Sequence, residues 1–187
     1  MLNYTSAIKE NKNYTDLNIK EIVPIMKLNL RGKKRELLST VGKTLNMILP
    51  TEANTSSSSE KLTAIWLSPD EWMIFSNNIT EKDNNSYEIE EILYNNISKK
   101  SFGSVTDVTD QFVMINLNGT KIFELFSFGS PFDFNQFKEK KGSTTQTIIN
   151  HIDVIIHHKD TNNVNLFVRR SFSEHLWSWI NDCASRL

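Results

Sequence analysis

Residues 62–75 read LTAIWLSPDEWMIF, and the fold can be worked out from this stretch. Two apolar runs, at 62–67 and 72–75, flank the tetrapeptide Ser-Pro-Asp-Glu at 68–71. Proline followed by aspartate favours a tight turn, so the segment is predicted to form a β-hairpin. The apolar side chains of such a hairpin must be buried against other elements, and the flanking sequence predicts which elements bury them.

The segments on both sides of the hairpin predict helices. Upstream, a short strand at 25–30 ends at Gly32, and apolar residues then recur at helical spacing over 33–45. The stretch 51–60, TEANTSSSSE, is too polar to pack and is predicted as a loop. Downstream, residues 87–98 place their apolar side chains on one helical face. The order is therefore strand, helix, strand, strand, helix.

The same order recurs in the second half of the chain. A strand at 112–118 ends at Gly119, and Thr120 is predicted to cap a helix over 122–126. Ser171 and Glu174 are predicted to form a capping box for a last helix. Three strands are expected between these helices, at 144–150, 154–158 and 165–168, and the last two align with the hairpin of the first half. The last helix is expected to bury Phe172, Leu176, Trp179, Ile180 and Cys183.

This repetition predicts an α+β fold made of two pseudo-repeated, ferredoxin-like halves. Each half alone would leave an apolar sheet face uncovered, so the halves are expected to pack as one domain over residues 21–187. Their approximate bounds are 21–99 and 100–187. Residues 1–20 are polar and weakly periodic, and they are predicted to form a loosely ordered N-terminal arm.

Composition and charge exclude several classes of protein. The 21 basic and 22 acidic residues leave a net charge of −1, which argues against a dedicated binder of nucleic acid or of anionic membranes. A single cysteine excludes an intrachain disulfide framework and a cysteine-rich zinc site. No signal peptide and no apolar run of ~20 residues is evident, so a cytoplasmic location is expected.

No self-sufficient catalytic, cofactor or metal motif occurs. His157 and His158 are adjacent on a predicted strand and point to opposite faces, so they cannot hold one ion together; they are interpreted as surface or edge histidines. Cys183 lies late in a helix, where the dipole opposes a thiolate, and is interpreted as structural. No catalytic residue is therefore predicted on this chain.

Two clusters remain as candidates for a structural role or a subunit interface. The tryptophan-turn cluster consists of Trp66, Asp70, Glu71 and Trp72. The arginine cluster consists of Arg169, Arg170 and Phe172. Arginine binds carboxylates through two parallel hydrogen bonds, so an ion pair between an acid of the first cluster and an arginine of the second is one expectation. Plain hairpin packing and a solvated charge pair are the alternatives.

The residues of these clusters resemble a known family, the gamma subunits of heterotetrameric sarcosine oxidase. The heptapeptide at 66–72, WLSPDEW, is similar to the family signature W-L-G-P-D-E-W, with Ser68 in place of the usual glycine. Arg169 stands where proline is common. The resemblance covers about residues 22–185. Its other pieces, in the family's order, are Leu30-Arg31-Gly32, Leu49-Pro50, Asp107-Val108-Thr109-Asp110, Pro131-Phe132-Asp133-Phe134, Gln146-Thr147, Arg169-Arg170-Ser171-Phe172 and Leu176-Trp177-Ser178-Trp179.

The resemblance implies a function for the complex and a non-catalytic role for this chain. Sarcosine would be oxidatively demethylated to glycine, with hydrogen peroxide as one product and formaldehyde or 5,10-methylenetetrahydrofolate as the other. It implies alpha, beta and delta subunits as partners, which would hold FAD, FMN, NAD, tetrahydrofolate and zinc. It also implies a fold similar to the folate-binding domain of aminomethyltransferases.

Two other functions remain open at this stage. The first is a stand-alone folate-binding or one-carbon-transfer protein, for which Asp107, Asp110 and Phe132 are the suggestive residues. The second is an adaptor subunit of a related demethylase that acts on another N-methylated amine.

Overall fold

The computed structural model describes residues 5–8, 10–23, 25–32, 35–83 and 85–187, and these form two compact units. The first unit contains Pro24–Asp110, and the second contains Thr5–Val23 together with Gln111–Leu187. Each unit is an antiparallel sheet with helices, which confirms the α+β class. Within the described residues, no helix is long and apolar enough to cross a membrane.

The first unit is built on a five-stranded sheet in the order β4-β5-β6-β3-β7. The predicted hairpin is confirmed, since β5 and β6 pair with Trp66 opposite Trp72. Apolar residues of the strands and helices share one core, which lies on a single face of the sheet. The elements are β3 (Lys27–Arg31), α1 (Arg35–Leu45), β4 (Ser56–Ser58), β5 (Leu62–Ser68), β6 (Glu71–Ser76), α2 (Glu88–Leu93), the π-helix η1 (Tyr94–Ser98) and β7 (Ser104–Asp107).

The second unit is built on a six-stranded sheet in the order β1-β2-β8-β11-β10-β9. Its core joins alternate residues of the strands, such as Val113 and Val154, to Leu125 and Leu176 of the helices. The elements are β1 (Lys12–Tyr14), β2 (Leu17–Glu21), β8 (Phe112–Gly119), α3 (Ile122–Ser127), α4 (Phe134–Phe137), β9 (Thr144–Ile149), β10 (Ile152–Asp160), β11 (Asn163–Arg169), the 3-10 helix η2 (Arg170–Phe172) and α5 (Ser173–Ala184).

The repeat expected from the sequence is present in the sheet topology. The order β4-β5-β6-β3 in the first unit corresponds to β9-β10-β11-β8 in the second, and all these neighbours pair antiparallel. In each unit a further strand then pairs with the first strand of the repeat: β7 with β3, and β2 with β8. This strand closes the ferredoxin-like sheet, and we call it the closing strand.

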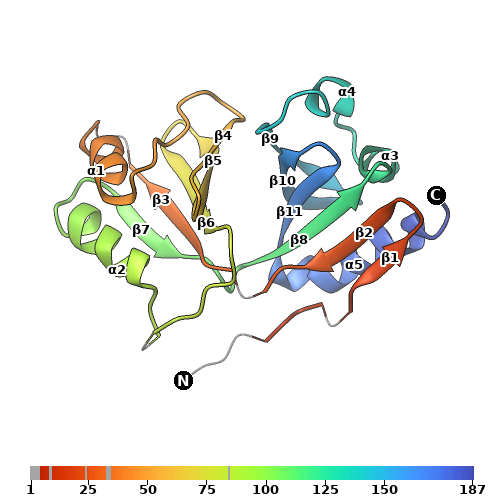
Figure 1. Ribbon diagram of the computed structural model, residues 1–187, viewed down its shortest axis with the longest axis horizontal. Coiled ribbons are helices and arrows are strands. Elements are labelled where there is room, and N and C mark those ends of the chain that lie inside the picture. The colour runs from red at the N-terminus through yellow and green to blue at the C-terminus, as the bar shows by residue number, and fades with distance from the viewer. Residues whose placement is uncertain (1–4, 9, 24, 33–34, 84) are drawn as a thin grey trace. The chain divides into compact units, whose positions relative to one another are not determined.

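The prediction of a loosely ordered arm over 1–20 is wrong for the residues that form β1 and β2. Leu17 and Ile19 are each 1% exposed, and β2 lies beside β8, as the red and green arrows of Figure 1 show. The buried Glu21 carboxylate accepts hydrogen bonds from the Ser6 hydroxyl at 2.5 Å and the Ile8 amide at 2.7 Å. The segment has few apolar residues, so it was not predicted as a strand. Its apolar residues alternate with polar ones, and this alternation is sufficient for a strand of which only one face is buried. Residues 1–4 and 9 lie outside the described residues.

A glycine marks the meeting of the first strand and the closing strand in each unit. A Cβ on Gly32, just after β3, would lie 2.8 Å from the Phe102 carbonyl oxygen, on the approach to β7. A Cβ on Gly119, at the end of β8, would lie 1.9 Å from the Asp16 carbonyl oxygen, just before β2. Gly119 also has φ +149°, a conformation that other residues rarely adopt. Gly32 and Gly119, which each end the first strand of a half, therefore have the same physical role.

Several local predictions differ from the structure. The predicted loop at 51–60 contains the edge strand β4, and neither β7 nor α4 was expected. Lys121, not Thr120, is the N-cap of α3. The capping box of Ser171 and Glu174 does not form, because the 3-10 turn η2 precedes α5 and Phe172 becomes its N-cap. Phe172 is 50% exposed and not buried, since it lies in that turn and outside the helix face. The predicted helix over 33–45 begins at Arg35, and residues 33–34 lie outside the described residues.

Candidate functional site

The tryptophan-turn cluster is tied into the first unit by its own hydrogen bonds. The buried Trp72 indole donates to the Pro50 carbonyl oxygen at 2.7 Å. The Ser68 hydroxyl donates to the Asp70 carboxylate at 2.9 Å, and the Glu71 carboxylate accepts from the Asn29 side-chain amide at 2.7 Å. Trp66 is partly buried and packs on the same core as Trp72. These contacts stabilise the hairpin and the strand beside it.

The arginine cluster lies in the second unit, where β11 passes into α5. Arg169 is exposed, and its guanidinium carbon lies 5.9 Å from the centroid of the Phe112 ring, a cation–π arrangement. The Arg170 guanidinium donates to the Thr5 carbonyl oxygen, which attaches the N-terminal segment to this unit. Phe172 is half exposed. The cluster thus combines one anchoring arginine with an exposed arginine and an exposed aromatic ring.

The structure brings each cluster together but leaves the pairing between them a prediction. Asp70 and Glu71 belong to the first unit, and Arg169 and Arg170 to the second. The contacts described above lie within one unit in every case.

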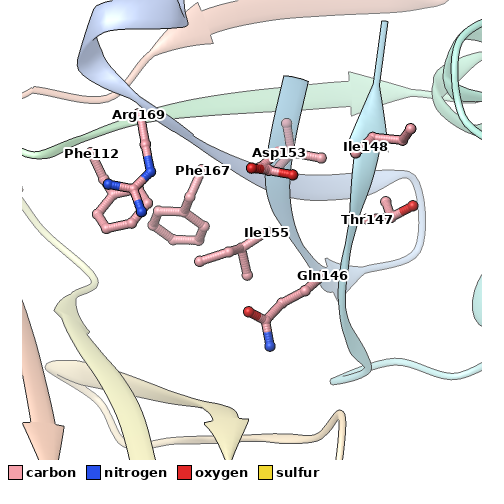
Figure 2. A pocket seen from close by; sticks show the side chains of 9 residues that line it. Phe112, Gln146, Thr147, Ile148, Asp153, Ile155, Phe167 and Arg169 are labelled. Carbon is pink, nitrogen blue, oxygen red and sulfur yellow. The ribbon is translucent and has the colours of Figure 1, made fainter. Parts of the chain in front are cut away.

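A pocket of about 500 Å³ opens on the face of the second unit's sheet that points away from its helices. The lining residues Phe112, Phe167 and Arg169 alternate along their strands with Val113 and Val168, which point into the helical core, so these three lie on the opposite face. Figure 2 shows the Arg169 side chain beside the Phe112 ring, with side chains of β9 and β10 on the neighbouring strands. The lining includes Phe112, Gln146, Asp153, Ile155, Phe167 and Arg169.

Sequence reasoning did not predict a polar cluster around Asp107 in the first unit. The Asp107 carboxylate pairs with the Lys82 ammonium at 2.5 Å and accepts from the Thr109 amide at 2.8 Å. Burial acts to raise the pKa of Asp107, but the hydrogen bonds from Lys82 and Thr109 outweigh it and hold the pKa below its ordinary value. Lys27 is 1% exposed, and its ammonium donates to the carbonyl oxygens of Ile25 at 3.0 Å and Thr109 at 3.3 Å. The Asp-x-Thr spacing is a turn signal that points to this cluster in the sequence.

The histidines differ from the prediction of surface or edge positions. His157 and His158 are 3% and 2% exposed, whereas His151 and His175 are exposed. Burial, followed by the nearby charges of Lys159 and His158, lowers the pKa of His157 from 6.5 to about 4. The ring of His158 lies edge-on to Phe123, with centroids 5.5 Å apart. The apolar run of β10 thus continues through both histidines, and this continuity was the signal for their burial.

Cys183 lies near the end of α5 and is partly buried. Burial, together with the Asp182 carboxylate, raises the pKa of its thiol above the ordinary value. A raised pKa leaves less of the reactive thiolate at neutral pH. In the part of the chain that the structure describes, no group of three or more histidine, cysteine, aspartate or glutamate residues could hold a metal ion.

Comparisons with known proteins identify both the fold and the family. One chain of "Heterotetrameric Sarcosine Oxidase from Corynebacterium sp. U-96 in complex with pyrrole 2-carboxylate" has a TM-score of 0.80 and 18% identity, over 91% of this chain and 84% of that chain. The glycine cleavage system aminomethyltransferase T from Bartonella henselae has a TM-score of 0.61 and 14% identity, over 88% of this chain and 45% of that chain. At these identities the two likenesses show a shared fold. No curated protein sequence matches the chain.

A family model described as "Sarcosine oxidase, gamma subunit family" matches residues 33–186. The matched segment begins before α1 and ends after α5, so it contains most of both repeats. The chain therefore belongs to the sarcosine oxidase gamma subunit family.

Proposed function

We propose that this chain acts as the gamma subunit of a cytoplasmic, heterotetrameric, flavin-dependent sarcosine oxidase, with alpha, beta and delta subunits as its partners. The complex would convert sarcosine to glycine and reduce oxygen to hydrogen peroxide. The one-carbon unit would leave as formaldehyde or pass to tetrahydrofolate. The family match over residues 33–186 carries this proposal, and the likeness to a chain of a heterotetrameric sarcosine oxidase supports it.

The role proposed for this chain within the complex is structural and not catalytic. FAD, FMN, NAD, tetrahydrofolate and zinc are assigned to the partner subunits. Two observations on reactive side chains agree with this role. Asp107 is engaged by Lys82 and Thr109, and the thiol of Cys183 has a raised pKa.

The arginine cluster is proposed as part of a subunit interface, and the tryptophan-turn cluster as a structural element of the hairpin. Exposed arginine and aromatic side chains are enriched where proteins bind each other, and Arg169 and Phe172 are both exposed. Trp72 is buried and its indole is hydrogen-bonded within the first unit, as a structural role requires.

Coexpression of the tagged chain with the products of its neighbouring genes tests the proposal. We expect the chain to copurify with a flavoprotein whose absorbance spectrum shows bound flavin and which forms peroxide when sarcosine is added. The chain expressed alone should show neither property. A screen of N-methylated amino acids with the same complex would separate a sarcosine oxidase from a related demethylase. Copurification of no flavoprotein would contradict the proposal.

A second function, binding of a folate by the isolated chain, is favoured by the likeness to aminomethyltransferase T. The chain spans about half the length of that protein. The residues suggested for it have other contacts: Asp107 pairs with Lys82, and the Phe132 ring packs edge-on against Phe134 at 5.0 Å. Calorimetry with tetrahydrofolate and the isolated chain decides the matter, since tight binding would favour this second function.

A further inference from the structure

The described part of the chain passes between the two units at two places, after Val23 and after Asp110. The first crossing precedes β3 and the second follows β7, so both lie at the same end of this antiparallel pair. Pairing between the two strands stops at Leu28 and Asp107. Residues 25–26 and 108–110, which we call the crossing segments, lie beyond it. Their buried backbone groups therefore need partners other than the β3–β7 ladder.

The side chain of Lys27 bonds to both crossing segments. Lys27 is 1% exposed, and its ammonium donates to the Ile25 carbonyl oxygen at 3.0 Å and to the Thr109 carbonyl oxygen at 3.3 Å. Ile25 closely follows the first crossing, and Thr109 immediately precedes Asp110 at the second. One buried charge is thus shared between two segments that are far apart in the sequence.

The backbone of Lys27 joins the same segments. Its amide donates to the Thr109 hydroxyl at 3.0 Å, and that hydroxyl donates to the Lys27 carbonyl oxygen at 3.4 Å. The Val108 amide donates to the same carbonyl oxygen at 2.9 Å. Thr109 is 2% exposed, and its amide also donates to the Asp107 carboxylate at 2.8 Å. These bonds are shielded from water, so breaking one of them leaves a buried polar group unsatisfied.

We propose that Lys27 is a clamp that holds the two crossing segments together, so that they open and close as one. An uncharged side chain of similar length would fill the same space, but it would not donate to the Ile25 and Thr109 carbonyl oxygens. Each segment could then open without the other. Every contact of the clamp lies within the first unit, so the inference is independent of the proposed function.

Native-state amide hydrogen exchange of the full chain tests the clamp, because it measures the local opening of each segment. In the unaltered chain we expect the Lys27 and Val108 amides to have protection factors that agree within about threefold. Lys27→Met should speed exchange at position 27 and at Val108 at least about 10-fold, the size expected when a hydrogen bond from a charged group is lost. The amides of β5 and β6 should stay within about threefold of their unaltered rates.

Two further variants separate the clamp from a general loss of stability. Thr63→Val is the matched control, because Thr63 is 4% exposed and its hydroxyl bonds to the Asn77 side chain at 2.7 Å, outside the crossing segments. The Lys27 and Val108 amides of this variant should exchange within about threefold of their unaltered rates. Thr109→Val removes the hydroxyl bonds but keeps the carbonyl that binds the ammonium, so it should speed exchange at Val108 by less than Lys27→Met does.

Three outcomes would overturn the inference. If Lys27→Met leaves exchange in the crossing segments unchanged, Lys27 does not hold them. If it speeds exchange in β5 and β6 by the same factor, Lys27 stabilises the whole unit and clamps nothing in particular. If the Lys27 and Val108 protection factors of the unaltered chain differ by more than about 10-fold, the segments open independently. The last measurement needs no variant, so it decides the matter even where Lys27→Met does not fold.

Discussion

The two units of the molecule have the same sheet order but obtain their closing strands from different places in the sequence. In the first unit, β7 follows the helices α2 and η1, as in an uninterrupted ferredoxin-like repeat. In the second unit β2, which precedes Pro24–Asp110 in the sequence, takes the equivalent place beside β8. The position beside the first strand can therefore be filled by a strand that alternates buried and exposed residues, whether it precedes or follows the first strand in the chain.

The largest expected effect tests the glycine at which β8 meets its closing strand. Gly119→Ala should lower the free energy of unfolding by more than about 4 kcal/mol, because its Cβ would lie 1.9 Å from the Asp16 carbonyl oxygen at φ +149°. Urea unfolding measures the change. Gly42→Ala in α1 is the control: its Cβ would be 3.9 Å from its nearest neighbour, so we expect stabilisation of about 0.5–1 kcal/mol. Equal effects at the two glycines would contradict the prediction.

A core substitution in each closing strand compares β2 with β7 directly. Ile19→Ala should cost about 3 kcal/mol, because Ile19 is 1% exposed and its removal leaves a cavity in the second unit. Val105→Ala in β7 should cost about 1 kcal/mol, since Val105 is smaller and partly exposed. Urea unfolding of both variants gives the comparison. A negligible effect of Ile19→Ala would restore the interpretation of this segment as a loose arm.

Acid should destabilise the second unit through His157. All histidines of the chain lie in that unit. The pKa of His157 is about 4 in the fold and 6.5 for an ordinary histidine, so below about pH 6.5 the unfolded chain takes up the extra proton. Stability is therefore full above pH 6.5 and falls towards pH 4, by about 2 kcal/mol between pH 7 and pH 5. Unfolding measured across this range should show the slope in the unaltered chain.

Two histidine substitutions show which residue causes the decrease in stability at low pH. His157→Gln should flatten it, whereas substitution of the exposed His151 by glutamine should leave it in place. A slope that persists in His157→Gln would mean that another group causes the acid sensitivity.

The smallest expected effect concerns the ion pair of Lys82 and Asp107 in the first unit. Lys82→Ala should cost up to about 1 kcal/mol at neutral pH, because the pair is only partly buried and is screened by solvent. The pKa of Asp107 is lowered in the fold, so the contribution is present above its ordinary value of 3.8 and is lost as the pH falls through the lower folded value. Lys121→Ala, which breaks the more exposed pair with Glu124, is the control and should cost less. A larger loss for Lys121→Ala would contradict the ranking.

The fold was predictable where each segment shows its own pattern. The hairpin around Pro69 and Asp70 combines two apolar runs with turn residues, and both of its strands are present. The strands β4 and β7 were not predictable in this way, because Ser56–Ser58 and Ser104–Asp107 are short and polar and owe their extended form to pairing with β5 and β3. The cap of α5 was predicted wrongly because a 3-10 turn competes with it at the same residues.

The candidate site was predictable in its residue types and not in its arrangement. The sequence singled out Arg169, because adjacent arginines at a strand end are unusual in a chain with five arginines. It did not connect Arg169 with Phe112, which is its partner across β8 and β11, or with Gln146 of β9. Those neighbours follow from strand register over long sequence separations, which no local pattern encodes.

The sequence by itself determined the α+β class, the internal repeat and the resemblance to the gamma subunit family, because apolar periodicity, turn residues and motif order are local properties of a chain. Only the tertiary structure decided that β2 closes the second unit's sheet, that His157 and His158 are buried, and that Arg169 borders a pocket. The physical reason is that burial and strand pairing depend on partners far away in the chain. A polar-looking segment such as Leu17–Glu21 becomes part of a core once β8 supplies the other side of the ladder.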